Sequence, residues 1–298
     1  MTARAANLSG VLALGFWSTS IAFTRAVTEA FGGPFMCGAF LYLGGGALLL
    51  GLAWARGGVQ AITGGHTWRG LAACMAPFVL YTTLYTWALA RAPSREVAVQ
   101  LGLVNYLWPL ATVLLSIAFF RCRVRWGLLV PGAVCAVAGA ALATMPEGGI
   151  ALFLPAMAGN AVPFAAMLVA AVSWGLYSNL SRRFAAGAKG NAVPLYQLAG
   201  GCVFLLMGVG LGETAHAPAG HWGAAFFLMV FPVALAYRLW DAAVRGGDLV
   251  LLGAISYAAP LVSTLFACWF LGEPLHAGLL YGCVAIMAGA VLTRRSVT

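Results

Sequence analysis

A polar side chain, two aromatic rings and a proline stand together in one apolar stretch of the chain, and a related group follows 151 positions later. The first group is Asn105-Tyr106-Leu107-Trp108-Pro109, and the second is Ser256-Tyr257-Ala258-Ala259-Pro260. A proline inside a membrane helix frees backbone carbonyls that a neighbouring group must satisfy. Two such breaks at matching places in a chain indicate the walls of a binding site.

The side chains of these groups are polar or aromatic, and they carry no formal charge. Asn105 and Ser256 can donate or accept hydrogen bonds, while carbonyls freed by Pro109 and Pro260 can hold an ammonium group. Each aromatic face attracts an ammonium or stacks on a ring by about 0.5 to 2 kcal/mol. The chemistry predicted for this site is therefore weak, multiple binding of a zwitterion that has an apolar side chain.

We extend the predicted site to polar and aromatic residues that share helix faces with these groups or occupy equivalent places in the two halves. The predicted substrate-binding residues are Trp17, Tyr81, Tyr85, Asn105, Trp108, Trp174, Tyr177, Ser256 and Tyr257. Pro109 and Pro260 are predicted hinges or pocket walls. For the aromatic members the alternative is ordinary packing between helices. Trp54, Trp68, Trp126 and Trp222 lie at segment ends and are predicted to mark the membrane interface.

The elements that position these residues must be membrane helices. Of the 298 residues, 62% are hydrophobic and 8% are charged, and the mean hydropathy is +0.94. A spanning helix needs roughly 20 apolar residues. The apolar runs predict an all-α integral membrane protein of ten helices, at about 8 to 28, 35 to 55, 70 to 90, 97 to 120, 126 to 144, 162 to 184, 193 to 211, 222 to 242, 248 to 271 and 276 to 293. We expect the run from Leu8 to be the first helix and not a cleaved signal peptide.

Asp, Glu, His and Lys are missing from the middle of every predicted helix, where they would be expensive and usually functional. Asp241 and Asp248 are predicted to flank the turn between helices eight and nine. No nucleophile has a His or Lys base in its own segment, and the seven cysteines show no metal-ligand spacing. We therefore expect no enzyme activity, no cofactor and no metal site.

The net charge of +9 comes mainly from basic residues between apolar segments. With the amino terminus in the cytoplasm, thirteen of the sixteen Lys and Arg residues face the cytoplasm, and both termini lie inside. The charge therefore indicates contact with membrane lipid in a bacterial-type inner membrane, and no nucleic acid. Arg25 is predicted to snorkel or to attract anions in an outer vestibule.

The two halves of the chain resemble each other. Trp17 to Arg25 matches Trp174 to Arg182 at an offset of 157, and Ala88 to Pro109 matches Leu239 to Pro260 at 151. Five helices in each half make the second repeat inverted. We predict a first five-helix repeat over residues 1–146, a linker over 147–159 and a second, inverted repeat over 160–298. Frequent glycines favour close helix packing, with a sliding surface during gating as the alternative.

Ten helices in two repeats, prolines in helices four and nine, and Phe270-Leu271-Gly272-Glu273-Pro274-Leu275 before the last helix resemble the drug/metabolite transporter superfamily, in its EamA-type exporter branch. The Gly272-Glu273 pair of this segment has no counterpart in the first half, which has Arg121-Cys122-Arg123 at the matching place. Within that branch the aromatic content and length are most similar to aromatic amino acid exporters. The resemblance implies a central cavity between the repeats and an outward movement of Phe, Tyr and Trp.

We therefore predict a monomeric or weakly oligomeric exporter of amino acids, chiefly aromatic and other apolar ones. It would work by alternating access and be driven by the substrate gradient, with proton coupling through Arg25 and Glu29 as the alternative. An exporter of hydrophobic drugs or organic cations on the same fold and a membrane sensor or scaffold without transport are the rival functions. A nucleotide-sugar carrier is disfavoured, because a doubly anionic substrate requires buried Lys or Arg.

Overall fold

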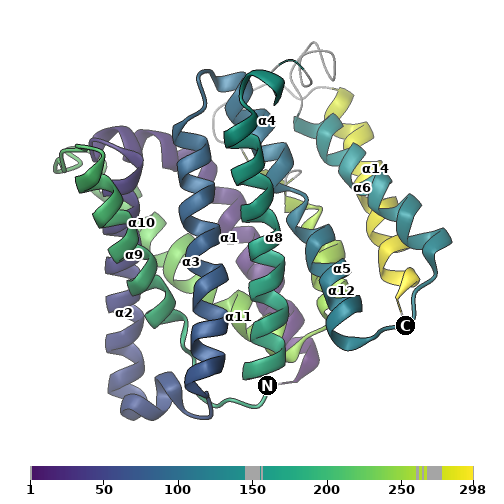
Figure 1. Ribbon diagram of the computed structural model, residues 1–298, viewed down its shortest axis with the longest axis horizontal. Helices are drawn as coiled ribbons and strands as arrows, with labels where there is room; N and C mark the ends of the chain where they lie inside the picture. The colour runs from purple at the N-terminus through teal and green to yellow at the C-terminus, as the bar shows by residue number, and fades with distance from the viewer. Residues whose placement is uncertain are drawn as a thin grey trace. The chain divides into compact units, whose positions relative to one another are not determined.

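The computed structural model describes residues 2–144, 155, 157–259, 262–263, 265–266 and 277–297, and it is built from helices (Figure 1). Pro260 therefore lies outside the described residues. The helices are α1 (Ala3–Ala30), α2 (Pro34–Thr63), α3 (Trp68–Ala90), α4 (Arg95–Asn105), α5 (Trp108–Phe120), α6 (Trp126–Thr144), α8 (Ala161–Ala185), α9 (Val193–Gly210), α10 (Trp222–Leu228), the π-helix η1 (Met229–Leu235), α11 (Ala236–Gly246), α12 (Leu249–Ser256) and α14 (Ala277–Ser296).

The predicted all-α membrane fold is confirmed. Six stretches are long and apolar enough to cross a membrane: Pro34–Thr63, Trp68–Ala90, Gln100–Phe120, Ala161–Ala185, Val193–Gly210 and Trp222–Gly246. Trp126–Gly139 is a shorter apolar helix. All of these fall on predicted segments, because the thickness of the bilayer fixes how long an apolar helix must be. The count of ten helices stays a prediction.

The predicted segment 97–120 is interrupted where its proline begins a new helix. α4 ends at Asn105, Tyr106 and Leu107 form a turn, and Pro109 lies in the first turn of α5, where a missing N–H costs nothing. α12 ends in the same way at Ser256, and Tyr257 and Ala258 form the turn. The two breaks thus occur at positions that the sequence match at offset 151 relates.

The chain folds into two compact units, and each unit contains residues from both halves of the sequence. Unit 1 comprises Met1–Thr83 and Leu180–Asp248, and unit 2 comprises Leu84–Asn179 and Leu249–Thr298. In unit 1, α2 packs along α9 and α1 packs along α11. Glycine permits the first contact, since a Cβ on Gly201 would come within 2.7 Å of the Leu43 side chain.

In unit 2, α6 and α14 lie side by side along most of their lengths, as the teal and yellow helices of Figure 1 show. Glycines bring the two backbones together. A Cβ on Gly139 would lie 2.7 Å from the backbone nitrogen of Ile286, and one on Gly289 would lie 2.5 Å from that of Ala136. α12 approaches α5 in the same way, with Gly253 against Val113 and Pro109. These contacts fit the close packing that small residues allow between membrane helices.

A third proline produces an irregular helix that the sequence reading did not anticipate. Pro232 lies inside η1, a π-helical turn between α10 and α11 in unit 1. Side chains of two neighbouring helices bind its carbonyls: Trp17 Nε1 donates to the Pro232 carbonyl at 2.9 Å, and Gln197 Nε2 donates to the Val233 carbonyl at 2.5 Å. Carbonyls released within apolar surroundings are thereby satisfied.

Candidate functional site

Three of the predicted aromatic residues form one buried cluster in unit 2. The Trp108 and Trp174 rings meet edge to face, with their centroids 6.3 Å apart and an interplanar angle of 88°. The Tyr177 ring also packs against Trp174, with the centroids 5.0 Å apart and an interplanar angle of 36°. The three side chains are at most 5% exposed. We call Trp108, Trp174 and Tyr177 the aromatic cluster.

The aromatic cluster lies where α5 crosses α8, and a glycine allows the crossing. A Cβ on Gly175 would approach the Thr112 backbone nitrogen to 2.9 Å, so a larger residue there would push the helices apart. Asn179 ties them together, because its Nδ2 donates to the carbonyls of Thr112 at 3.0 Å and of Gly175 at 2.8 Å. The contacts of Gly175 and Asn179 with Thr112 therefore hold α5 and α8 together, and these are the helices that carry Trp108 and Trp174.

Asn105 and Tyr257 each bury an oxygen that has no hydrogen-bond partner within the described part of the chain. The oxygens are Asn105 Oδ1 and Tyr257 Oη. Asn105 is 9% exposed at the end of α4, and Tyr257 is 1% exposed and packs against Ala136 and Ile286. A buried polar atom normally finds a partner. Gln100, Asn179 and Thr293 of unit 2 also carry such an oxygen, so Asn105 and Tyr257 are distinguished by being predicted site residues.

The remaining members of the predicted site in unit 2 have different surroundings. The Ser256 hydroxyl donates to the Leu252 carbonyl of its own helix at 2.6 Å. Tyr85 is partly buried near the end of α3, and its phenol interacts electrostatically with that of Tyr106. Pro109 is buried in the first turn of α5, next to the helix break, and its role as a hinge or pocket wall stays a prediction. Whether any of these residues binds substrate stays a prediction.

Trp17 and Tyr81 belong to unit 1. Trp17 contacts the rings of Tyr237 and Trp240, with centroids 5.4 and 5.6 Å away, and its indole N–H is used by the Pro232 carbonyl. Tyr81 is partly buried on α3. The contacts of Trp17 are those of a residue that supports the π-helix. They differ from those of Trp174, its predicted equivalent, which packs within the aromatic cluster.

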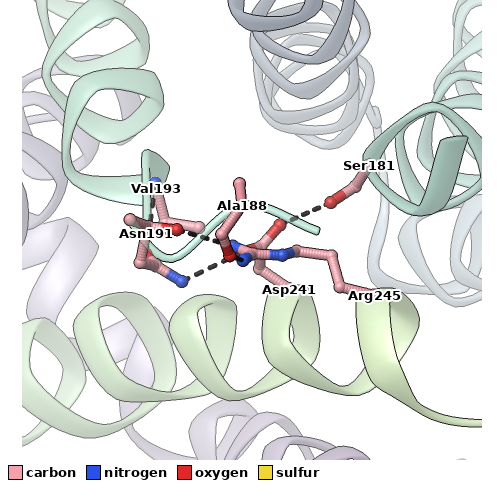
Figure 2. A network of polar contacts seen from close by, with 7 residues as sticks. Ser181, Ala188, Asn191, Val193, Asp241 and Arg245 are labelled. Carbon is pink, nitrogen blue, oxygen red and sulfur yellow. Dashed lines mark hydrogen bonds and ion pairs between the residues drawn. The ribbon is translucent and has the colours of Figure 1, made fainter. Parts of the chain in front are cut away.

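A buried polar network in unit 1 was not predicted (Figure 2). Asp241 is 3% exposed on α11. Its Oδ1 accepts a hydrogen bond from Ser181 Oγ at 2.6 Å, and its Oδ2 accepts from Asn191 Nδ2 and from Arg245 Nη1, each at 3.0 Å. Arg245 also donates to the carbonyls of Ala188 and Gly190. The network therefore fastens α11 to the end of α8 and to the connection between α8 and α9.

The sequence contained a signal for this network that the prediction did not use. Asp241 was expected at the turn after helix eight, whereas the structure continues α11 to Gly246. The spacing of four between Asp241 and Arg245 places both on one helix face, where an ion pair forms. The partners on residues 181 to 191 depend on how the connection folds, which spacing along one helix does not reveal.

His66 lies in the connection between α2 and α3, and Arg245 and Asp241 act on its charge. Burial lowers the pKa of His66, and the positive charge of Arg245 lowers it further, whereas Asp241 and two backbone groups act in the opposite direction. Its Nδ1 is buried without a hydrogen-bond partner among the described residues. The neutral form of His66 is therefore favoured in the folded protein.

Metal chemistry finds no support in the part of the chain that the structure describes. Within these residues no group of three or more His, Cys, Asp or Glu side chains could hold a metal ion. The aromatic cluster contains only neutral side chains. What this arrangement offers is ring faces and two amide or phenol oxygens, which suit reversible binding better than a chemical reaction.

Comparison with known proteins identifies the family. The model of the EamA-like transporter family matches residues 4–145 and again residues 163–295. The chain is 28% identical to the aromatic amino acid exporter YddG of Salmonella typhimurium, over 98% of this chain and 97% of the relative. It is 33% identical to the aromatic amino acid exporter YddG of Ancylobacter novellus, over 98% of both proteins.

A more distant relative and a solved structure extend the comparison. A probable terminal-alkyne amino-acid exporter of Streptantibioticus cattleyicolor is 26% identical over 72% of this chain and 69% of its own length. A crystal structure with 32% sequence identity covers 98% of this chain and 96% of its own, with a TM-score of 0.83. The helical fold is therefore shared with an experimentally solved protein.

Proposed function

Because this chain belongs to the EamA-like transporter family, we propose that it exports amino acids, chiefly aromatic and other apolar ones, across a bacterial-type inner membrane. The observation that carries the proposal is that unit 2 contains both the neutral aromatic cluster and the buried oxygen of Asn105, which has no hydrogen-bond partner among the described residues. Amino acid export is common to the names of the relatives given above. The proposed substrate class rests on these names, and the proposed roles of individual residues rest on their surroundings in this chain.

Transport proceeds by alternating access, in which the two predicted repeats rock around a central neutral, aromatic-lined cavity. Trp108 and Trp174 bind the apolar side chain of the substrate, and Asn105 binds one of its polar groups. Because these rings are at most 5% exposed, a substrate reaches them only after the helices move. Pro109 supports this motion, since the α4–α5 break lacks continuous helical hydrogen bonding.

The absence of fixed charge in the aromatic cluster supports a carrier in which substrate is held weakly. Several contacts of about 1 kcal/mol each permit both binding and release. The Asp241 carboxylate accepts hydrogen bonds from Ser181, Asn191 and Arg245. These contacts favour a structural role for Asp241 over a role in proton transfer. We propose facilitated export driven by the substrate gradient, with both termini in the cytoplasm.

Counterflow of radiolabelled phenylalanine in proteoliposomes tests the proposal. Trp108→Ala and Asn105→Ala should each lower the rate at least tenfold, while Trp126→Ala, at a residue that is 58% exposed, should leave it unchanged. Thermal unfolding of each variant confirms that it is folded. Equal rates for wild type and both site variants would overturn the proposal.

The same assay separates the rival functions. Unlabelled tryptophan and tyrosine should compete with phenylalanine, whereas organic cations and hydrophobic drugs should not. Competition by those compounds would favour a drug exporter on the same fold. Counterflow absent at both pH 6 and pH 8 would favour a sensor or scaffold, and a rate that depends on a pH gradient would favour proton coupling.

A further inference from the structure

A small pocket in unit 1 contains two arginines. It lies where the second half of α2 meets the starts of α9 and α11, and its volume is about 50 Å³. The lining residues are Leu49, Ala53, Arg56, Ala61, Asn191, Pro194 and Arg238. This volume holds a few water molecules. It accommodates a compact polar group and is too small for an aromatic amino acid, so it is separate from the transport site proposed above.

The two arginines have no partner in the part of the chain that the structure describes. Arg56 and Arg238 are close enough for their positive charges to repel each other, and neither guanidinium makes a hydrogen bond or an ion pair there. Arg245, two turns further along α11, is by contrast held by Asp241 and two carbonyls. An anion bound between these two cations would offset their mutual repulsion.

The backbone of α2 shapes this pocket through a break directly after Arg56. Gly57 and Gly58 leave the helical conformation, and Gly58 has φ 57 and ψ −145, which a residue with a Cβ rarely adopts. The chain beyond the break returns toward α9, where the Ala61 carbonyl accepts a hydrogen bond from the Asn191 backbone N–H at 3.0 Å. The break thus brings Ala61 into the same pocket as Arg56.

An apolar stripe on α2 leads to Arg56. Leu48 and Leu52 are 37% and 41% exposed, and with Arg56 they follow the spacing of four that places residues on one helix face. Trp54, 61% exposed, lies on the opposite face of α2 at a similar depth, and Val59, 55% exposed, follows the break at Gly57 and Gly58. Exposed aliphatic residues on a membrane helix face acyl chains, and tryptophan marks the headgroup level. The Arg56 guanidinium therefore lies at the polar end of a surface that faces lipid.

We propose that Arg56 and Arg238 bind the phosphate of an anionic phospholipid, whose acyl chain lies along Leu48 and Leu52. Guanidinium groups bind phosphate oxygens through paired N–H donors, which two arginines around one small pocket can supply together. A free phosphate ion would satisfy the arginines and leave the apolar stripe unused. The lipid accounts for both features, and this site does not depend on which solute the protein exports.

Native mass spectrometry of the purified full-length protein with phosphatidylglycerol tests the site. We expect Arg56→Gln and Arg238→Gln each to raise the dissociation constant of phosphatidylglycerol about fivefold, the effect of one basic residue at an anionic lipid surface. Arg69→Gln, which removes an exposed arginine outside the pocket, should leave it unchanged. Phosphatidylcholine should bind more weakly and equally to all four proteins.

Equal phosphatidylglycerol binding by wild type and Arg56→Gln, or an equal loss in Arg69→Gln, would overturn the proposal. Because Arg56 is exposed, that variant should fold even if Arg238→Gln does not, and thermal unfolding checks both. Excess inorganic phosphate separates the two sources of the anion. It should fail to displace phosphatidylglycerol, and full displacement would assign the pocket to a soluble anion instead of a lipid.

Discussion

At the scale of single residues, Asn105 Oδ1 and Tyr257 Oη distinguish unit 2 from an ordinary apolar core. Both atoms are buried without a hydrogen-bond partner among the described residues. Such an atom costs about 1 to 3 kcal/mol of stability. Several such atoms occur among the described residues, and for the two on predicted site residues substrate binding supplies a reason.

Apolar replacements separate a role in binding from a role in folding. Asn105→Leu and Tyr257→Phe remove the unpaired oxygens, so the melting temperature should stay the same or rise by a few degrees. Phenylalanine counterflow should nevertheless fall. Thermal unfolding and counterflow are measured on the same preparations, and a lower melting temperature with unchanged counterflow would mean that these oxygens serve the fold alone.

His66 makes stability depend on pH in a defined direction. Its folded-state pKa is lowered from the ordinary value of 6.5 by burial and by Arg245. Below pH 6.5 the unfolded chain takes up a proton that the folded protein resists, so His66 lowers stability as the pH falls. Between pH 7.5 and 5.5, His66→Gln should lose less in melting temperature than wild type does. His216→Gln, at an exposed histidine, should behave like wild type.

The residues that sequence could identify are those whose type is unusual for their surroundings. Asn105 in an apolar run and Trp108 beside a proline stand out without any knowledge of neighbours. His66 and Asp241 could not be recognised in this way, because each is common near a helix end. Their importance comes from Arg245 and the 181 to 191 segment, which only the folded chain brings to them.

At the scale of helices, hydropathy predicted where the helices lie, and proline predicted where one of them is interrupted. Neither predicted which side chains bind the carbonyls that an interruption frees. The break between α4 and α5 falls at Pro109, as its sequence indicates. Pro232 is equally visible in the sequence, yet its π-helical turn depends on Trp17 and Gln197 from two other helices. Sequence cannot show which helices become neighbours, so the contact between Trp17 and the Pro232 carbonyl could not be predicted.

The pair α6 and α14 permits a controlled test of glycine packing. Gly139→Ala places a Cβ against the Ile286 backbone nitrogen, and overpacking of this kind costs about 1 to 3 kcal/mol. The melting temperature should fall by several degrees. Gly127→Ala, on the same helix with open space around it, should have no such effect. Equal melting temperatures for the two variants would show that α6 and α14 separate easily, as a sliding surface requires.

At the scale of the whole molecule, the charge pattern predicts which side of the membrane each connection faces. Lys189 is the single lysine of the chain, and it is exposed in the connection between α8 and α9. The Ala188 and Gly190 carbonyls of the same connection accept hydrogen bonds from Arg245, so its position is fixed by contacts within unit 1. One residue therefore reports the orientation of a whole unit.

A membrane-impermeant amine reagent reads this orientation. With the amino terminus inside, Lys189 should react in inside-out vesicles and stay unmodified in intact spheroplasts, because the connection faces the cytoplasm. Peptide mass spectrometry locates the modification, and Lys189→Arg provides the unreactive control. Modification in spheroplasts alone would place both predicted cytoplasmic termini outside.

The division into two units also has a consequence for biosynthesis. α1 and α2 pack against α11 and α9, which the ribosome makes only after the 96 residues of Leu84–Asn179. α11 ends at Gly246, 183 residues after α2 ends at Thr63, so at about 5 to 20 residues per second both partners are complete only roughly 10 to 40 s later. During this time their glycine faces and Trp17 are exposed to lipid or to the insertion machinery. Unit 1 is therefore begun first and cannot be completed until most of the chain has been translated.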